Sequence, residues 1–293
     1  MTKQVTGEQT YKGRSMAQET WRRLLKNHGA VVGMVFLIAL FLVALMAGVI
    51  YDYETDIISM GTAMSQSPSW EHPFGTDNLG RDILARIVYG ARYSLLIGMG
   101  SVTLGLCMGV VTGSMAGFYG GAVDQVVMRA NDILYSIPNI MLAVVIVSMM
   151  GTGVSSLLVA LSISSATAFA KITRAAVMSI RGQEFIESAY ALGLPTWKII
   201  AKHVIPNCMS PIIVQVTLAI GSNIIAASSL SFLGVGIDTP KPEWGTMLAD
   251  GRNFIRSEPW MCIFPGLAIM FTVLALNLLG DGLRDALDPK LKK

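Results

Sequence analysis

Long uncharged apolar runs recur along the whole chain. Five are long enough to cross a bilayer as helices and a sixth lies at the lower limit, since their lengths fall between 17 and 25 residues. A spanning helix needs roughly 17–25 mainly apolar residues. The runs cover residues 30–51, 93–117, 133–150, 154–170, 212–233 and 261–280. They predict an all-α, polytopic membrane protein with about six transmembrane helices.

The weakest division is the one between the third and fourth runs. Only a tight turn at Gly151 to Gly153 separates them, so a five-span alternative stays open, and it would put the two termini on opposite sides. Pro138 in the third run and Pro265 in the sixth predict local kinks or helix starts.

The distribution of charge tests these alternatives. Under the six-span interpretation, the segments on the side of the two termini hold 16 Lys and Arg and 9 Asp and Glu, and the segments on the other side hold 6 and 10. The net charges are therefore +7 and −4, which sum to the total of +3. Basic residues accumulate on the cytoplasmic side of membrane proteins. Both termini are therefore predicted to be cytoplasmic, and the sequence pI of about 8.7 reflects topology and gives no reason to expect a nucleic-acid partner.

Composition agrees with an integral membrane protein. Of the 293 residues, 53% are hydrophobic and only 14% charged, against about a quarter charged in soluble domains. The first run is too long for the core of a signal peptide and no Ala-x-Ala site follows it, so we expect an uncleaved anchor. Cys107, Cys208 and Cys262 fall in or beside different segments, so neither a disulfide framework nor a metal cluster is expected.

The apolar runs contain no Asp, Glu, Lys, Arg or His. Transporters driven by ion gradients usually keep an ionisable group within the membrane, and voltage sensors need several. His28, His72 and His203 form no metal-binding spacing, and no Gly-Lys dipeptide exists for a P-loop. The sequence therefore predicts a non-catalytic chain that binds no cofactor, and uphill transport would need energy from a partner.

Two stripes of small residues lie on the predicted spans. Glycines recur every fourth residue in the second span, and we interpret them as a helix-packing surface: Gly105, Gly109, Gly113 and Gly117. In the fifth span the weakly polar stripe consists of Gln215, Ala219, Ser222, Ala226 and Ser229. This second stripe is expected to face the translocation path or a second permease.

Two short segments outside the runs have amphipathic patterns. Trp21, Leu24 and Leu25 share one helical face opposite basic residues, which predicts a surface helix or simply a basic flank that fixes topology. From Arg81, apolar residues at helical spacing predict a second interfacial helix: Ile83, Leu84, Ile87 and Val88.

The largest inner loop, residues 171–211, predicts two short helices joined by a sharp turn. Gly193 suits a left-handed C-terminal cap, Pro195 suits the first position of the next helix, and Pro206 is expected to end it.

The faces of these two helices are expected to differ in chemistry. Glu184 and Glu187 share one face of the first helix, Lys198 and Lys202 share one face of the second, and an apolar stripe is predicted from Phe185, Ala189 and Leu192. A compact knob of this kind would fit a pocket of a soluble partner. The alternative, a solvated loop, would leave Phe185, Trp197 and Ile200 poorly covered.

The loop resembles the EAA loop of ABC importer permeases, whose pattern is Glu-Ala-Ala, three residues, Gly, nine residues, then Ile-x-Leu-Pro. Glu187, Ala189, Gly193 and Pro206 match in register, whereas Ser188, His203 and Ile205 replace the first Ala, the Ile and the Leu. The resemblance implies that the knob docks onto an ATPase subunit. The coupling residues would be Glu184, Glu187, Ala189, Gly193, Pro195, Trp197 and Pro206.

Further motifs narrow the resemblance to the shorter, second permease subunit of the oligopeptide/dipeptide importer family. They occupy residues 72–82, 89–95, 231–236 with Trp244-Gly245, and the tail 280–289, and the likeness covers the chain from about residue 20.

This resemblance implies a type I ABC importer (MetI-like) transmembrane domain in the bacterial inner membrane. Its expected parts are a cytoplasmic segment 1–29, a first helix and external loop 30–92, a core 93–280 with the coupling loop, and a cytoplasmic tail 281–293. The implied partners are membrane lipid, a second permease, two ATPases that bind ATP and Mg, and an external solute-binding protein.

The implied function is to form half of a path for di- or oligopeptides. An importer of nickel chelates or glutathione would share the same motifs, and a secondary transporter or channel would be active without nucleotide.

Overall fold

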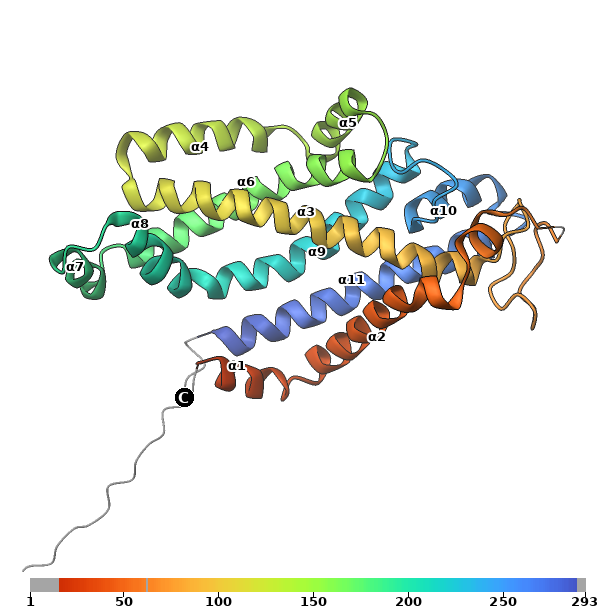
Figure 1. The fold of residues 1–293 in the computed structure, drawn as a ribbon, viewed down its shortest axis with the longest axis horizontal. Helices are drawn as coiled ribbons and strands as arrows, with labels where there is room; N and C mark the ends of the chain where they lie inside the picture. The colour runs from red at the N-terminus through yellow and green to blue at the C-terminus, as the bar shows by residue number, and fades with distance from the viewer. Residues whose placement is uncertain (1–15, 62, 289–293) are drawn as a thin grey trace, which may run out of the picture.

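The computed structural model describes residues 16–61 and 63–288, and it is helical almost throughout (Figure 1). In the described part the only β-type pairing is an isolated bridge between Thr76 and Asp82. Five helices are long and apolar enough to cross a membrane, and a sixth crossing arises if one bent helix pair counts as a single span. The predicted all-α membrane fold is confirmed.

The eleven α-helices of the described chain follow one another in this order: α1 Met16–Leu24, α2 His28–Ile50, α3 Ile83–Tyr119, α4 Gly121–Ser136, α5 Asn139–Met150, α6 Val154–Ile180, α7 Glu184–Ala191, α8 Thr196–Ile199, α9 Met209–Phe232, α10 Trp244–Gly251 and α11 Trp260–Leu287. Short π or 3-10 turns complete the described helical structure: η1 Tyr53–Ile58, η2 Ile200–Val204, η3 Ile205–Cys208 and η4 Arg252–Phe254.

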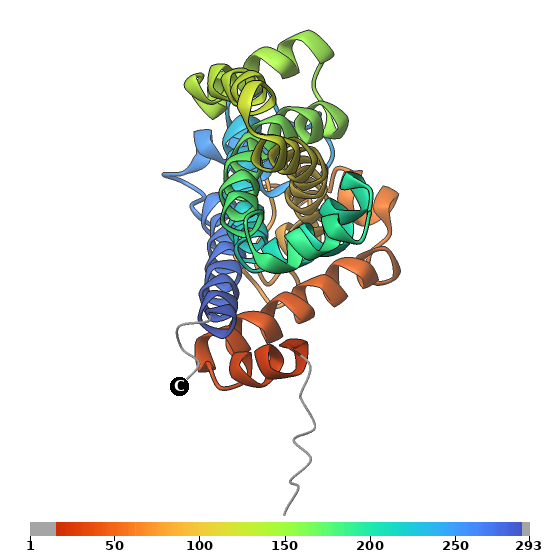
Figure 2. The same ribbon diagram turned by 90° about the vertical axis from the view of Figure 1, so that its left-hand side faces the viewer.

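The long helices lie side by side, with α3, α6 and α11 running in one direction and α2 and α9 in the opposite one (Figures 1 and 2). Helices α1, α7 and α8 and the end of α11 gather at one end of the bundle, which we call the α7 end. Helix α10 and the loop after α2 lie at the opposite end, the α10 end. Both described ends of the chain therefore lie at the same end of the bundle, as the six-span interpretation requires.

The third run is interrupted at Pro138, where a kink or a helix start was predicted. Helix α4 ends at Ser136, α5 begins at Asn139, and the two axes differ by 90°. Pro138 has no N–H to donate and holds the residue before it away from helical dihedrals, and Ile137 is indeed extended at φ −85° and ψ 127°. Pro138 thus separates two helices, which count as a single crossing under the six-span interpretation.

Two predicted boundaries were wrong. Helix α3 starts at Ile83, so the segment predicted to be a separate interfacial helix forms its first turns. This segment packs into the bundle, because Ile83 is buried in one cluster with Trp244. Helix α6 continues past residue 170 to Ile180, because its charges have partners on α4. Arg174 pairs with Asp124 at 2.5 Å and Lys171 with Asp132 at 3.2 Å.

The central contact of the bundle joins α3 to α6 along the glycine stripe. A Cβ atom at Gly105 would lie 2.6 Å from the Cβ of Ser165, and one at Gly109 would lie 2.7 Å from the carbonyl oxygen of Ala166. Gly113 and Gly117 would likewise place a Cβ atom within 3 Å of α6. The missing side chains allow the two backbones to approach this closely, which is the packing mode of small-residue stripes in membranes.

The N-terminal helix divides its apolar side chains between two environments. Leu24 is buried against Ala30 and Ala286, which attaches α1 to the end of α11. Trp21 and Leu25 are 54% and 46% exposed, so they do not share the buried face. Residues 1–15 of the expected cytoplasmic segment lie outside the described part.

Candidate functional site

The two-helix knob at the α7 end is built around the turn between α7 and α8. Gly193 has φ +72°, its N–H donates to the carbonyl of Tyr190 at 2.9 Å, and the N–H of Leu194 donates to the carbonyl of Ala189 at 3.2 Å. This pair of hydrogen bonds is a Schellman motif, which needs a left-handed residue at the position of Gly193. The turn therefore fixes the direction in which α8 leaves α7.

The second half of the knob continues into α9 without a non-helical break. Pro195 is the N-cap, and α8 begins at Thr196, one residue later than predicted. The prediction that Pro206 ends the helix was wrong, since the chain is helical from Thr196 to Phe232. Pro206 cannot donate a hydrogen bond, and the π turn η2 and the 3-10 turn η3 shift the pairing around it. The second half of the knob and α9 thus form one continuous helical segment.

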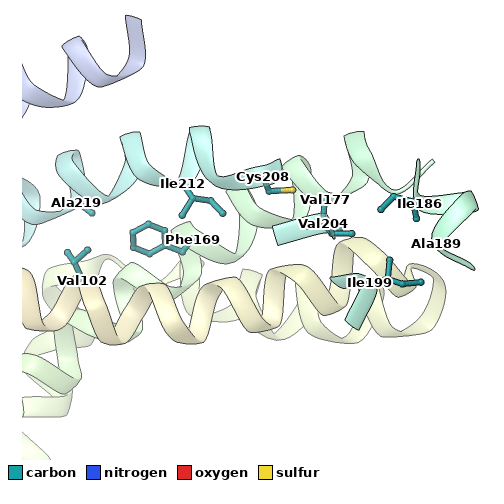
Figure 3. Close-up of a cluster of buried hydrophobic side chains, with 10 residues drawn as sticks. All are labelled: Val102, Phe169, Val177, Ile186, Ala189, Ile199, Val204, Cys208, Ile212 and Ala219. Atoms are coloured by element: carbon teal, nitrogen blue, oxygen red, sulfur yellow. The ribbon is translucent and has the colours of Figure 1, made fainter. Parts of the chain in front are cut away.

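A chain of buried apolar side chains, which we call the spine, ties the knob to the bundle (Figure 3). Its members come from the knob and from α3, α6 and α9: Val102, Phe169, Val177, Ile186, Ala189, Ile199, Val204, Cys208, Ile212 and Ala219. The apolar stripe predicted for α7 was only partly right, because the buried residues of this helix are Ile186 and Ala189. Phe185 and Leu192 are exposed instead.

The outer surface of the knob combines exposed apolar and charged side chains. Leu192 is 80% exposed and Trp197 63%, and Phe185 and Tyr190 are exposed beside them. The predicted coupling residues Glu184, Glu187 and Pro206 are also exposed. Aromatic groups with charges around them are typical of protein interfaces. The surface is therefore suited to a soluble partner.

The predicted stripe on α9 does not present a single face. Ala219 is buried in the spine, Ser222 is exposed, and the others are half-buried: Gln215, Ala226 and Ser229. The exposed line of this helix runs instead through Ser222, Ile225 and Phe232. Spacing on a helical wheel identified the small residues, but the position of α3 and α6 decides which of them are covered.

A buried polar contact that sequence reasoning missed joins three helices. The side-chain amide of Asn223 on α9 donates to the hydroxyls of Ser101 on α3 at 2.8 Å and of Ser165 on α6 at 2.9 Å. Hydrogen bonds between transmembrane helices fix their relative rotation. The sequence feature that could have revealed this contact is the side-chain amide of Asn223 within an apolar run.

A network of four charges organises the α10 end. Asp77 accepts hydrogen bonds from Arg81 at 2.7 Å and from Arg86 at 2.5 Å, and both arginines lie within 4 Å of Asp250. Burial raises the pKa of the Asp250 carboxyl above its ordinary value, and Arg86 and Arg81 oppose this shift. Arg81 and Asp250 also line an open cavity of about 690 Å³ beside Thr239 and Arg252.

Glu243 anchors α10 to the bundle. Its fully buried carboxylate accepts the N–H of Thr246 at 3.0 Å in a capping box and lies within hydrogen-bond reach of the hydroxyls of Ser94 and Ser228. Trp244-Gly245, which follows it, belongs to a recognised motif, but Glu243 itself was not predicted to have a role. In the described part, no group of three or more His, Cys, Asp or Glu side chains could hold a metal ion.

The exposure pattern of α9 gives a direct prediction. Single cysteines at Ser222 and Ala219, in a background without the three natural cysteines, should differ in reaction with a small water-soluble thiol reagent. Ser222→Cys should react at least tenfold faster if the exposed line borders an aqueous path, because Ala219 is covered by the spine. Equal slow reaction at both positions would show that lipid or protein covers this line. Ile213→Cys and Leu218→Cys on the half-buried flanks provide the controls.

Comparisons with known proteins agree with this architecture. Residues 109–293 match the family described as binding-protein-dependent transport system inner membrane component, and residues 15–68 match the N-terminal TM domain of oligopeptide transport permease C.

Two curated relatives resemble nearly the whole chain. The dipeptide transport system permease protein DppC of Alkalihalophilus pseudofirmus is 44% identical, covering 97% of this chain and 93% of the relative. The glutathione transport system permease protein GsiD of Pectobacterium atrosepticum is 43% identical, covering 94% and 91%.

A solved structure shares the fold. A chain of the inward-facing MetNI methionine ABC transporter aligns with a TM-score of 0.57 and 18% identity, covering 69% of this chain and 96% of that chain.

Proposed function

This chain belongs to the family of binding-protein-dependent transport system inner membrane components, and from that membership we propose that it is one permease subunit of an ATP-binding-cassette importer for peptides. It is a multi-pass membrane protein with the type I importer fold. The observation that carries the mechanism is the continuity of the exposed knob with α9. A movement imposed on the knob reaches the membrane helices directly.

The partner at the knob is a cytoplasmic ATPase subunit. Exposed Trp197 and Leu192 supply an apolar contact, and Glu184 and Glu187 supply charge at its rim. Two such ATPases would bind ATP and Mg, while this chain binds neither and catalyses no covalent step. A second, homologous permease would supply the other half of the path, and an external solute-binding protein would deliver the cargo at the α10 end.

The proposed orientation places the α7 end in the cytoplasm of a bacterial cell. The excess of Lys and Arg in the segments of that end supports it. Reporter fusions at residues 1 and 293 should both report the cytoplasm. Signals on opposite sides would show that α4 and α5 together do not cross the membrane.

The proposed cargo is a di- or oligopeptide. The name of the 44% identical relative supports dipeptides, and the 43% identical glutathione permease keeps glutathione as the second candidate. Competition between labelled dipeptide and unlabelled glutathione for uptake by one assembled complex separates the two cargoes. A nickel chelate would compete with neither.

The test of the proposal is uptake by the complete complex in liposomes with its binding protein. Peptide should accumulate only when ATP is present on the side of the knob, and uptake should stop with a non-hydrolysable ATP analogue. Accumulation by this chain and its partner permease without ATPase subunits would instead show a secondary transporter or channel.

A further inference from the structure

An open apolar groove lies between α2 and α3. Its volume is about 300 Å³, and it is lined by Phe41, Ala44, Leu45, Arg92, Leu95, Leu96, Met99 and Gly100. Arg92 is the one charged residue among them. Both helices are long and apolar enough to span a membrane, so the groove opens in a surface suited to lipid.

The guanidinium of Arg92 has no anion beside it in the described part of the chain. Its side chain is exposed, and among the described residues it makes no ion pair or hydrogen bond, only a cation–π contact at 5.2 Å from the centre of the Tyr89 ring. It rests against α2 at Gly48, where a Cβ atom would lie 2.9 Å from one of its Nη atoms. A positive charge is therefore held at one end of an apolar groove.

The positions of Arg92 and the groove along α2 and α3 match the depths of a phospholipid headgroup and acyl chain. Gly48 is two residues from the end of α2, which is about 3 Å along the helix axis. From Gly48 to Phe41 on α2, and from Arg92 to Gly100 on α3, the groove runs about 10–12 Å toward the middle of both helices. Half of the hydrocarbon layer is about 15 Å thick. The charge thus lies at headgroup depth and the groove at acyl-chain depth.

We propose that this groove binds one glycerophospholipid, with its phosphate on Arg92 and an acyl chain between α2 and α3. A guanidinium presents paired N–H donors that match phosphate oxygens, and the ion pair is stronger where water is scarce. The occupant would fill an apolar gap and neutralise the one charge beside it. The site concerns neither the transported peptide nor the ATPases, so it is independent of the proposed cargo.

The proposal is tested on the assembled importer by native mass spectrometry after extensive detergent washing. The wild-type complex should retain one phospholipid that Arg92→Leu reduces at least fivefold and Arg92→Lys reduces less. Arg129→Leu is the matched control, because Arg129 is an exposed arginine on α4 that also makes no ion pair among the described residues. Unchanged retention in Arg92→Leu would overturn the proposal.

The apolar half of the site has its own control. Leu45→Trp should fill the groove and lower phospholipid retention, whereas Val49→Trp, one turn away and 84% exposed, should not. Assembly of each variant with the other subunits shows that it is folded.

The identity of the occupant is tested by a benzophenone side chain introduced at Leu45. It should give a cross-linked product with the mass of a phospholipid. Capture of the second permease would show that this groove is a subunit contact, and the lipid site would be wrong.

Discussion

Replacing Gly109 by isoleucine is expected to abolish recovery of folded protein from the membrane. A Cβ atom at this position would lie 2.7 Å from the carbonyl oxygen of Ala166 and closer still to the Cβ of Phe169, whereas ordinary contacts exceed 3.4 Å. Neither neighbour is the end of a flexible side chain, so α3 and α6 would have to separate. Overpacking of a core typically costs about 1–3 kcal/mol, and separating this central helix pair should cost more.

The measurement is the fraction of a fluorescent fusion that elutes as a single folded peak from size-exclusion chromatography in mild detergent. Gly109→Ala should lower this fraction and Gly109→Ile should eliminate it. Val111→Ile, a control on the same helix at a 58% exposed position, should match the wild type. Normal elution of Gly109→Ile would mean that α3 and α6 are not held together at this stripe.

The sequence predicted the helical type and the approximate number of crossings because run length limits what can span a bilayer. It failed where helices extend beyond the apolar run. Lys171 and Arg174 were assigned to a loop because each is charged, yet α6 continues through them since Asp132 and Asp124 of α4 lie opposite. Such partners are 39 and 50 residues away in the sequence, so local composition could not reveal them.

Residues that mark turns and helix breaks were predicted more reliably from the sequence than the buried faces of helices. Gly193 and Pro138 were identified because each has a backbone property that no neighbour can supply. The buried face of α7 was assigned wrongly to Phe185 and Leu192, because both Ile186 and Phe185 are apolar and only the contact with the spine distinguishes them.

The polar contacts inside the bundle could not be predicted from the sequence for a similar reason. Asn223 and Glu243 are single polar residues in apolar or loop sequence, and their partners come from other helices. Arg86 binds Asp77, which lies in the loop before α3. Their burial becomes meaningful only when the packing of α3, α6 and α9 is known. The family motifs included Trp244 and Arg81 but assigned no partner to either.

Replacing Gly193 by valine is expected to abolish ATP-driven peptide uptake while leaving membrane insertion intact. The residue has φ +72°, and no atom lies within 4 Å of where its Cβ would be, so the effect acts on the backbone and not through a steric clash. Holding a non-glycine residue in this region costs about 1–3 kcal/mol, and a β-branched residue is disfavoured most. The turn would open, and α8 would leave α7 in another direction.

Three further variants separate this backbone effect from other causes. Gly193→Asn should keep most of the uptake, since Asn tolerates left-handed dihedrals, and Gly182→Val should be normal, because Gly182 also has open space around it but no positive φ. Glu187→Lys should leave the fold intact, since its side chain is exposed, yet reverse a charge at the ATPase contact. It should therefore lower ATPase retention during purification and the stimulation of hydrolysis by loaded binding protein. If Gly193→Val and Glu187→Lys both transport and retain the ATPases normally, the knob is not the coupling element, whatever its continuity with α9.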